Sequence, residues 1–224
     1  ILYAIGGYDG VHRLSSAERF DPSVGRWLPL PSLSKQRNAA GGAVVKGRIY
    51  VAGGTGEQEF EPLRGVDGLG ERVVEDWSVP DVSGDPASGE AVGEEPTWSS
   101  VERYDPSLNL WSAVAPMRKE RAFFGMATLD GKLYVAGGIS SEEYLSSAEV
   151  YDPSSNSWAP IAPLQAARAF HGMAAFRGKL YVSCGKDKYS NLLKSVESYD
   201  PLTGVWKEEQ PNLQVRRALQ LVAC

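Results

Sequence analysis

The stretch that decides the fold is residues 121–158, RAFFGMATLDGKLYVAGGISSEEYLSSAEVYDPSSNSW. Residues 168–206 repeat it as RAFHGMAAFRGKLYVSCGKDKYSNLLKSVESYDPLTGVW, and residues 37–111 repeat it with additional residues in the middle. The chain begins inside a further copy, at ILYAIGG, and ends inside another, at RRALQLVAC. The period is about 47 residues, which is typical of units that must stack on their neighbours to bury their faces. The sequence therefore predicts a repeat protein.

Each repeat predicts four β-strands. A stretch of small apolar residues follows the repeat Arg, as an innermost strand requires where neighbouring units crowd together. A tight turn such as Asp130–Gly131 then leads into a buried strand that ends in a glycine doublet. The third strand reads S-x-E-x-Tyr/Phe-Asp, and its exit reads Asp-Pro in all four copies, which predicts a type I turn into an outer strand carrying a Trp.

These features resemble the kelch repeat: the glycine doublet, the Tyr-Asp pair of the third strand, and the Trp seven residues after that Tyr. Departures are few, with Cys184 for a doublet glycine, Phe20 for the Tyr, and Gln220 where three copies have Gly. The resemblance covers the chain apart from one insertion. It implies an all-β fold, a kelch-type β-propeller, most often of six blades, that acts as a protein-recognition module.

The repeat phase divides the chain into four four-stranded blades. Their expected bounds are residues 1–30 plus 216–224, 37–113, 121–160 and 168–208. The last strand, residues 217–224, is expected to pair beside residues 2–7 and so complete the first blade, which removes two exposed sheet edges. The ring either closes at four blades or belongs to a larger, six-bladed propeller. The sequence alone does not choose between these.

An acidic insertion lies within residues 55–97, between the second glycine doublet and its third strand. It holds twelve acidic and two basic residues, and it shows neither a strand nor a helix period. Removing its charge of −10 from the net −5 of the chain leaves +5 for the repeats. Low hydrophobicity with high net charge predicts a disordered segment.

The residues give little support for catalysis. An enzyme needs a nucleophile with a base, an acid pair or a metal set in one cleft, and the chain has only two histidines, His12 and His171. We expect His171, on an inner strand, to be a core residue. A kelch-fold copper oxidase, the alternative from another class, would need Tyr and His ligands that these histidines do not supply. We predict no enzyme activity, no metal site and no cofactor.

Nucleic acid, membrane and redox roles are also disfavoured. No basic run interleaved with aromatic residues occurs, and each repeat Arg is matched by a repeat Glu, which predicts structural pairing of the two sets. No apolar run approaches the length of a membrane span. Two cysteines and no glycosylation sequon are typical of a reducing compartment, so a cytoplasmic location is expected.

One face of the propeller is predicted to carry recognition. The loops after the glycine doublets and the connections from outer to inner strands share this face, and their residues vary among the copies, whereas the Asp-Pro turns on the other face hardly vary. Tyr and Arg dominate binding hot spots. The candidate partner-binding residues are Tyr8, Asp9, His12, Arg13, Lys35, Asn38, Lys119, Phe123, Tyr144, Phe170, Lys186, Asp187, Tyr189 and Arg217. Core packing is an equally good interpretation of the two Phe residues.

The resemblance implies a peptide or protein ligand on this face. It points to the substrate-recognition part of a ubiquitin-ligase adaptor, with any contact to a cullin-RING ligase made by segments outside this chain. The alternative within the family is an actin-binding or scaffolding kelch protein. A BTB segment in the full-length gene product would favour the adaptor.

Overall fold

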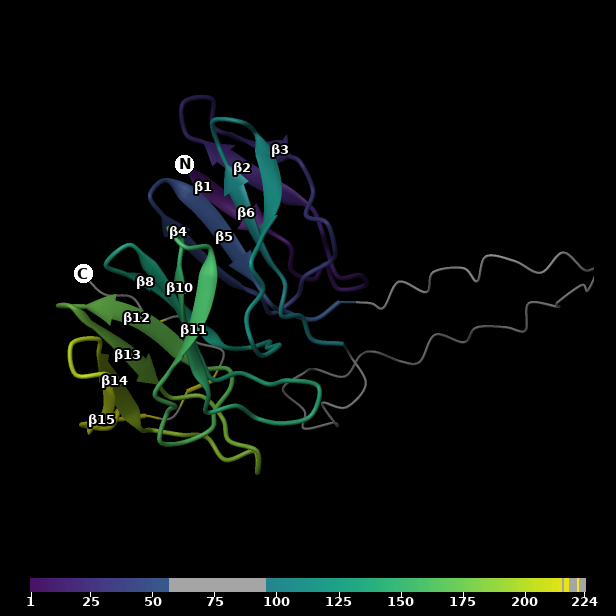
Figure 1. The fold of residues 1–224 in the computed structure, drawn as a ribbon. Helices are drawn as coiled ribbons and strands as arrows, with labels where there is room; N and C mark the ends of the chain where they lie inside the picture. Colours follow the sequence, from purple (N-terminus) through teal and green to yellow (C-terminus); the bar gives the residue numbers. More distant parts are fainter. Residues whose placement is uncertain (57–95, 215, 218–220, 222–224) are drawn as a thin grey trace, which may run out of the picture.

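The computed structural model describes residues 1–56, 96–214, 216, 217 and 221. This part of the chain folds into fifteen β-strands in four antiparallel sheets, which fan out side by side as the blades of a propeller (Figure 1). The predicted all-β propeller architecture is confirmed. No helix long and apolar enough to cross a membrane occurs among these residues.

The strands follow the order that the repeats predict, from an inner edge to an outer edge. The first blade contains β1 (Leu2–Ile5), β2 (Ala17–Asp21) and β3 (Arg26–Leu30). The second contains β4 (Gly41–Val45), β5 (Arg48–Ala52), β6 (Val101–Asp105) and β7 (Leu110–Val114). The third contains β8 (Gly125–Leu129), β9 (Lys132–Ala136), β10 (Ala148–Asp152) and β11 (Ser157–Ile161). The fourth contains β12 (Gly172–Phe176), β13 (Lys179–Ser183), β14 (Val196–Asp200) and β15 (Val205–Glu209).

The turns have the conformations that their residues predict. Both residues of the turn between β8 and β9, Asp130 and Gly131, have positive φ, as a two-residue hairpin turn of type I′ requires. Each Asp-Pro turn ends in a left-handed Gly or Asn, for example Asn156 with φ 48°. The Asp152 carboxylate accepts the backbone N–H of Ser154 at 2.8 Å, which fixes the start of the turn.

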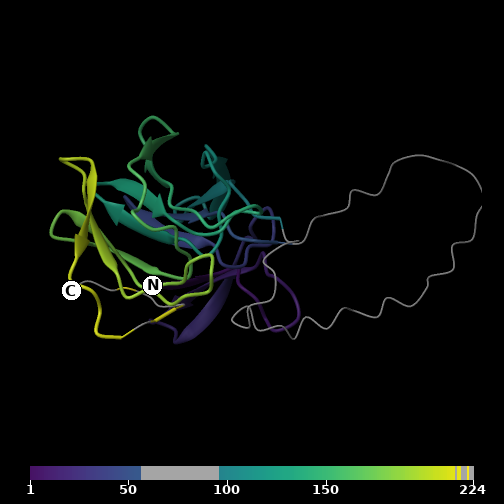
Figure 2. The same cartoon turned by 90° about the horizontal axis from the view of Figure 1, so that it is seen from below.

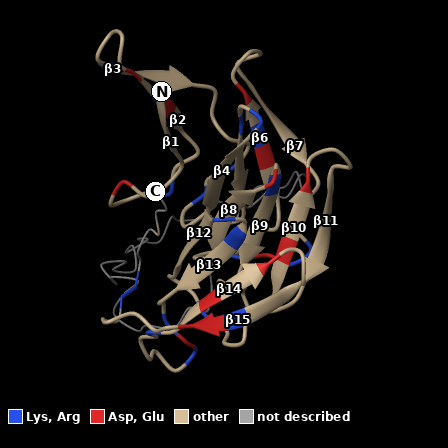
Figure 3. Ribbon diagram, turned by 90° about the vertical axis from the view of Figure 1, so that its left-hand side faces the viewer, with Lys and Arg blue, Asp and Glu red and all other residues tan. Residues whose placement is uncertain are grey.

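The inner strands β4, β8 and β12 lie side by side and line the centre of the fold (Figure 3). Each pair of neighbouring blades then shares its own apolar layer, because successive side chains of a strand face opposite neighbours. On β9, Leu133 packs toward the second blade, whereas Tyr134 packs toward Leu180 of the fourth. The core therefore lies in layers between neighbouring sheets. Figure 2 shows these sheets from below.

The repeated Arg and Glu residues form buried ion pairs inside the blades. Arg37 binds Glu102, Arg121 binds Glu149 and Arg168 binds Glu197, at N–O distances of 3.0, 2.8 and 2.7 Å. The three guanidinium groups also donate to the carbonyl oxygen of the first doublet residue, as Arg121 does to Gly137 at 2.7 Å and Arg168 to Cys184 at 3.1 Å. The predicted structural pairing is confirmed for these three Arg residues, so they are unavailable for phosphate contacts.

The first blade differs from the others because its described part has three strands. The segment expected to complete it, residues 217–224, falls largely outside the described residues, as does most of the acidic insertion. Arg216 keeps the repeat phase, since its carbonyl accepts the N–H of Gly185 at 3.0 Å as Arg168 accepts that of Gly138. Among the described strands, none of the first blade contacts one of the fourth (Figure 3).

The outer-strand Trp residues of the second, third and fourth blades each bond to the connection from the preceding blade. The Trp158 indole N–H donates to the carbonyl of Ala115 at 2.9 Å, and its ring packs on Tyr151. Trp111 and Trp206 make the equivalent bonds to Pro31 and Ala162. Trp27, in the first blade, makes no such bond among the described residues and is 46% exposed.

We expect Trp158→Phe to lower the free energy of unfolding by about 2 kcal/mol, because it removes a hydrogen bond between blades and leaves a gap in a packed layer. Urea denaturation followed by fluorescence or circular dichroism measures this change. Trp27→Phe is the matched control and should change stability by less than about 0.5 kcal/mol. Equal effects of the two substitutions would contradict the role assigned to the interblade bond.

Candidate functional site

The loops after the glycine doublets and the connections between blades form one surface, which we call the doublet face. In each described blade the second doublet residue donates its N–H to the carbonyl of the next repeat Arg, as Gly7 does to Arg37 at 2.8 Å and Gly54 to Arg121 at 2.9 Å. The Arg N–H in turn bonds back to the loop, for example from Arg168 to the carbonyl of Leu145. Variable loops are therefore held in fixed positions by repeated backbone bonds.

At the centre of this face, three equivalent residues of the second, third and fourth blades line the mouth between the inner strands. Ala39, Phe123 and Phe170 have φ of 53°, 55° and 57°. The Phe123 N–H donates to the Ala39 carbonyl at 3.0 Å, and the Phe170 N–H donates to the Phe123 carbonyl at 2.9 Å. The two aromatic rings pack against each other with centroids 4.3 Å apart and planes tilted by 35°, and both side chains are only partly buried.

Lys186 borders the aromatic pair from the fourth blade. Its backbone forms an antiparallel bridge with Ala169, with N–O distances of 2.9 and 3.0 Å. Its Nζ lies 5.9 Å from the centroid of the Phe170 ring. Phe123, Phe170 and Lys186, all three predicted from the sequence, are thus brought together at one place.

The loop that follows Lys186 is ordered by Asp187. The Asp187 carboxylate accepts the backbone N–H groups of Tyr189 and Asn191 at 2.9 Å each. Burial opposes ionisation of Asp187, but bonds from Asn191 and Tyr189 outweigh it and lower its pKa. Burial, with the charge of Asp187, raises the pKa of Tyr144, which reaches this position from the third blade. Tyr189 at the tip of the loop is 72% exposed.

The first blade presents its own loop on the doublet face. Tyr8 and Arg13 face each other across an isolated bridge, and the Tyr8 hydroxyl donates to the carbonyl of Gly10 at 2.9 Å. The Asp9 carboxylate accepts the N–H groups of Val11 and His12, the latter bond lowering the pKa of Asp9 most. Tyr8, Asp9 and His12 are exposed. These residues belong to the first blade, whereas Lys186 belongs to the fourth.

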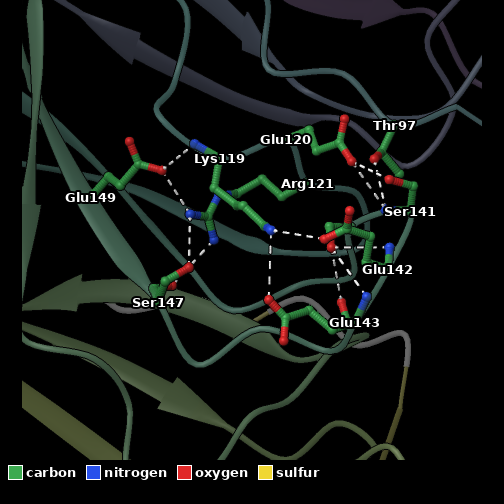
Figure 4. A network of polar contacts seen from close by, with 10 residues as sticks. Thr97, Lys119, Glu120, Arg121, Ser141, Glu142, Glu143, Ser147 and Glu149 are labelled. Atoms are coloured by element: carbon green, nitrogen blue, oxygen red, sulfur yellow. Dashed lines mark hydrogen bonds and ion pairs between the residues drawn. The ribbon is translucent and has the colours of Figure 1, made fainter.

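The positive charge of Lys119 is offset by acidic neighbours. Its Nζ lies 3.7 Å from Glu142 and 3.6 Å from Glu143, both on the loop after the third doublet (Figure 4). The carboxylate of Glu120 bonds to Ser141 on the same loop, and Thr97 accepts the Ser141 N–H at 3.1 Å (Figure 4). This part of the doublet face carries both signs of charge.

The second blade adds a contact that the sequence did not reveal. Lys35 lies with its Nζ 4.3 Å from the centroid of the Trp98 ring, a cation–π contact. Trp98 occupies the repeat position that Leu145 and Leu193 fill in the next two blades, and nothing in the sequence indicated that its ring meets Lys35. The Asn38 side chain accepts the N–H of Ala39 and so supports the mouth, and Arg217 is exposed at the end of the described chain.

The described residues contain no group of three or more His, Cys, Asp or Glu side chains placed to hold a metal ion. His171 is buried between two glycines of the third blade and its Nε2 accepts the Gly125 N–H at 3.1 Å. The sequence-based interpretation of His171 as a core residue is confirmed.

The chain is similar to known proteins along most of its described length. The family model of the Kelch motif matches residues 1–34, 120–165 and 167–212. Kelch-like protein 23 of Mus musculus is 32% identical over 62% of this chain and 26% of its own length. Kelch repeat and BTB domain-containing protein 1 of Cowpox virus is 30% identical over 62% of this chain and 19% of its own length. Kelch-like ECH-associated protein 1A of Danio rerio is 30% identical over 62% and 17%. The matched part spans about a quarter or less of these curated relatives.

Proposed function

The chain belongs to the kelch-repeat family, and from this premise we propose that its doublet face binds a segment of a partner protein. The observation that carries the proposal is where the repeat is broken. The residue after each doublet is Tyr8, Thr55, Ile139 or Lys186, whereas the exits of the third strands keep Asp-Pro in every copy. Scaffold residues obey a repeat, and residues that break it on rigidly held loops are suited to recognition. Binding is proposed in place of catalysis.

The partner contact is expected to depend on exposed aromatic side chains of this face. We predict that Tyr189→Ala and Tyr8→Ala each weaken a captured partner by about 1–3 kcal/mol, roughly 5- to 150-fold in Kd. Both side chains are exposed, so the melting temperature should stay within about 2 °C of the parent. Affinity capture from a cell extract, followed by titration of the retained protein, gives the Kd values. Thermal unfolding gives the melting temperatures.

Leu202→Ala is the matched control for these variants. Leu202 is an apolar side chain, 96% exposed, on an Asp-Pro turn at the opposite end of its blade. The control variant should bind as the parent does. If the Leu202 variant lost binding and the two Tyr variants kept it, recognition would lie on the face of the Asp-Pro turns, and the proposal would be wrong.

A finer proposal is that the propeller recognises substrates for a ubiquitin ligase of the cullin-RING type. Support comes from likeness to Kelch-like proteins, one of which carries a BTB domain in its name. The ligase contact would lie in segments outside this chain. Coprecipitation of a cullin with the full-length gene product tests this, and its absence would leave a scaffolding role. A cytoplasmic location is proposed with it, which agrees with Cys184 being a free thiol.

A further inference from the structure

Lys186 is a charged residue in a position that its counterparts fill with uncharged ones. Thr55 and Ile139 occupy the same place after their doublets and form the same backbone bridges in the second and third blades. All three side chains are at least nine-tenths buried, and Lys186 is 6% exposed. The fold therefore does not require a Lys here, because Ile139 shows that an apolar side chain fits the position.

The Lys186 ammonium has no carboxylate partner within ion-pair distance among the described residues. Its neighbour Asp187 is engaged with Tyr189 and Asn191, and the closest aromatic contact is the face of Phe170. The side chain is buried along its aliphatic stem, whereas its Nζ keeps contact with solvent. An unpaired ammonium that reaches solvent beside an aromatic ring is placed to meet an anion from outside the chain.

The fold does not require aromatic residues at the positions of Phe123 and Phe170 either. A left-handed φ is unfavourable for a bulky side chain, and Ala39 adopts the same conformation in the second blade with a single methyl group. Phe123 and Phe170 nevertheless adopt it, and they place two partly exposed rings in contact with each other at the mouth. The rings offer an apolar surface immediately next to the ammonium.

We infer that Lys186, Phe170 and Phe123 form a subsite for a carboxylate that is adjacent to an apolar side chain in the bound segment. The carboxylate pairs with the Lys186 ammonium, and the apolar side chain packs on the two rings. One ammonium suits a singly charged carboxylate, whereas phosphate groups are usually held by several cations or by Arg forks. The inference rests on the proposed function, because it names the chemistry that the doublet face recognises.

The test uses two synthetic octapeptide libraries, in which each position is varied in turn, and the purified protein. One library is acetylated and amidated, so that only Asp and Glu supply carboxylates; the other keeps a free carboxyl terminus. The parent should prefer Asp or Glu over Asn or Gln by about tenfold or more at one position, with an apolar preference next to it. A preference seen only in the second library assigns the carboxylate to the chain end and supports the same subsite.

Variants then separate the two halves of the subsite. Lys186→Ile copies Ile139 and should abolish the acid preference, as should Lys186→Met, while the apolar preference remains. Phe123→Ala and Phe170→Ala, which copy Ala39, should remove the apolar preference. Lys207→Ile, an exposed Lys on β15, is the control for lost charge and should bind like the parent.

The outcomes distinguish this inference from the proposed function. Peptide binding that depends on Tyr189 but shows no acid preference, or keeps it in both Lys186 variants, overturns the subsite and leaves recognition by the doublet face standing. No binding of either library to the parent, or binding unaffected by any doublet-face variant, overturns the proposed function and the subsite with it.

Discussion

Replacing Glu149 by Ala is expected to lower the free energy of unfolding by about 3–5 kcal/mol, because it leaves the buried Arg121 guanidinium without its counter-ion. Arg121 is fully buried, and its NH2 lies 2.8 Å from Glu149 Oε1. Burial lowers the pKa of Arg121, and Glu149 acts in the opposite direction. Glu149 also accepts the N–H groups of Arg118 and Lys119, so its removal frees the connection that supports the doublet face.

Thermal unfolding measures this effect as a fall in melting temperature of roughly 10 °C for a chain of this size. Glu18 occupies the same repeat position in the first blade but is exposed and has no ion pair among the described residues. Glu18→Ala is therefore the matched control and should change stability by less than about 0.5 kcal/mol. A double variant, Arg121→Met with Glu149→Met, should recover much of the loss, since buried pairs can be replaced by apolar residues. Similar melting of the Glu149 and Glu18 single variants would exclude a stabilising role for the pair.

The fold could be predicted because the same turn residues and strand patterns recur in each blade. Asp130–Gly131 and Asn156 encode turns, and the strands between them alternate in a way that only one pairing satisfies. The ion pairs followed from the same repetition, since Arg121 and Glu149 recur together. A residue that recurs with the repeat can be recognised from a single sequence, and such a residue usually has a structural role.

The candidate site could be predicted only as a set of loops. Nothing periodic indicates that Lys119 meets Glu142 and Glu143, because these loops differ in length and sequence between blades. The left-handed conformation of Phe170 was also hidden, since Phe does not favour it. Side-chain directions in variable loops depend on neighbours that are distant in sequence, and these were visible only once the blades were assembled.

The second large effect concerns pH and a single buried imidazole. His171 is 5% exposed and lies between the third and fourth blades, where its ring leaves no room for a side chain at Gly125 or Gly137. Burial lowers its pKa from 6.5 to about 3, and the charges of Arg168 and Arg121 act in the same direction. In the folded protein the ring is therefore neutral throughout the range in which the unfolded chain takes up a proton.

The sign of the effect follows from this depressed pKa. Above pH 6.5 the ring is neutral in both states and contributes no pH dependence. Below pH 6.5 the unfolded state binds a proton that the folded state does not, so stability falls by up to about 1.4 kcal/mol per pH unit until the pH nears 3. Between pH 6.5 and 4.5 the loss should reach about 2–3 kcal/mol. Bonds from Ser107 and Arg48 lower the pKa of the turn residue Asp105 to about 2, and the contribution of this carboxylate is lost mainly below pH 4.

His171→Phe isolates the imidazole, because the third blade already carries Phe at the equivalent position. The ring of Phe124 covers Gly41 and Gly53 as His171 covers Gly125 and Gly137, so the substitution copies a packing arrangement that this fold contains. Urea denaturation of the parent and the variant at pH 6.5, 5.5 and 4.5 gives the comparison. The parent should lose about 2–3 kcal/mol more across this window than the variant does, since the carboxylates titrate alike in both and cancel in the comparison. If the free energy of unfolding fell with pH at the same rate in both proteins, the buried imidazole would be taking up its proton in the folded state. The apolar layer between the third and fourth blades would then accommodate a charge.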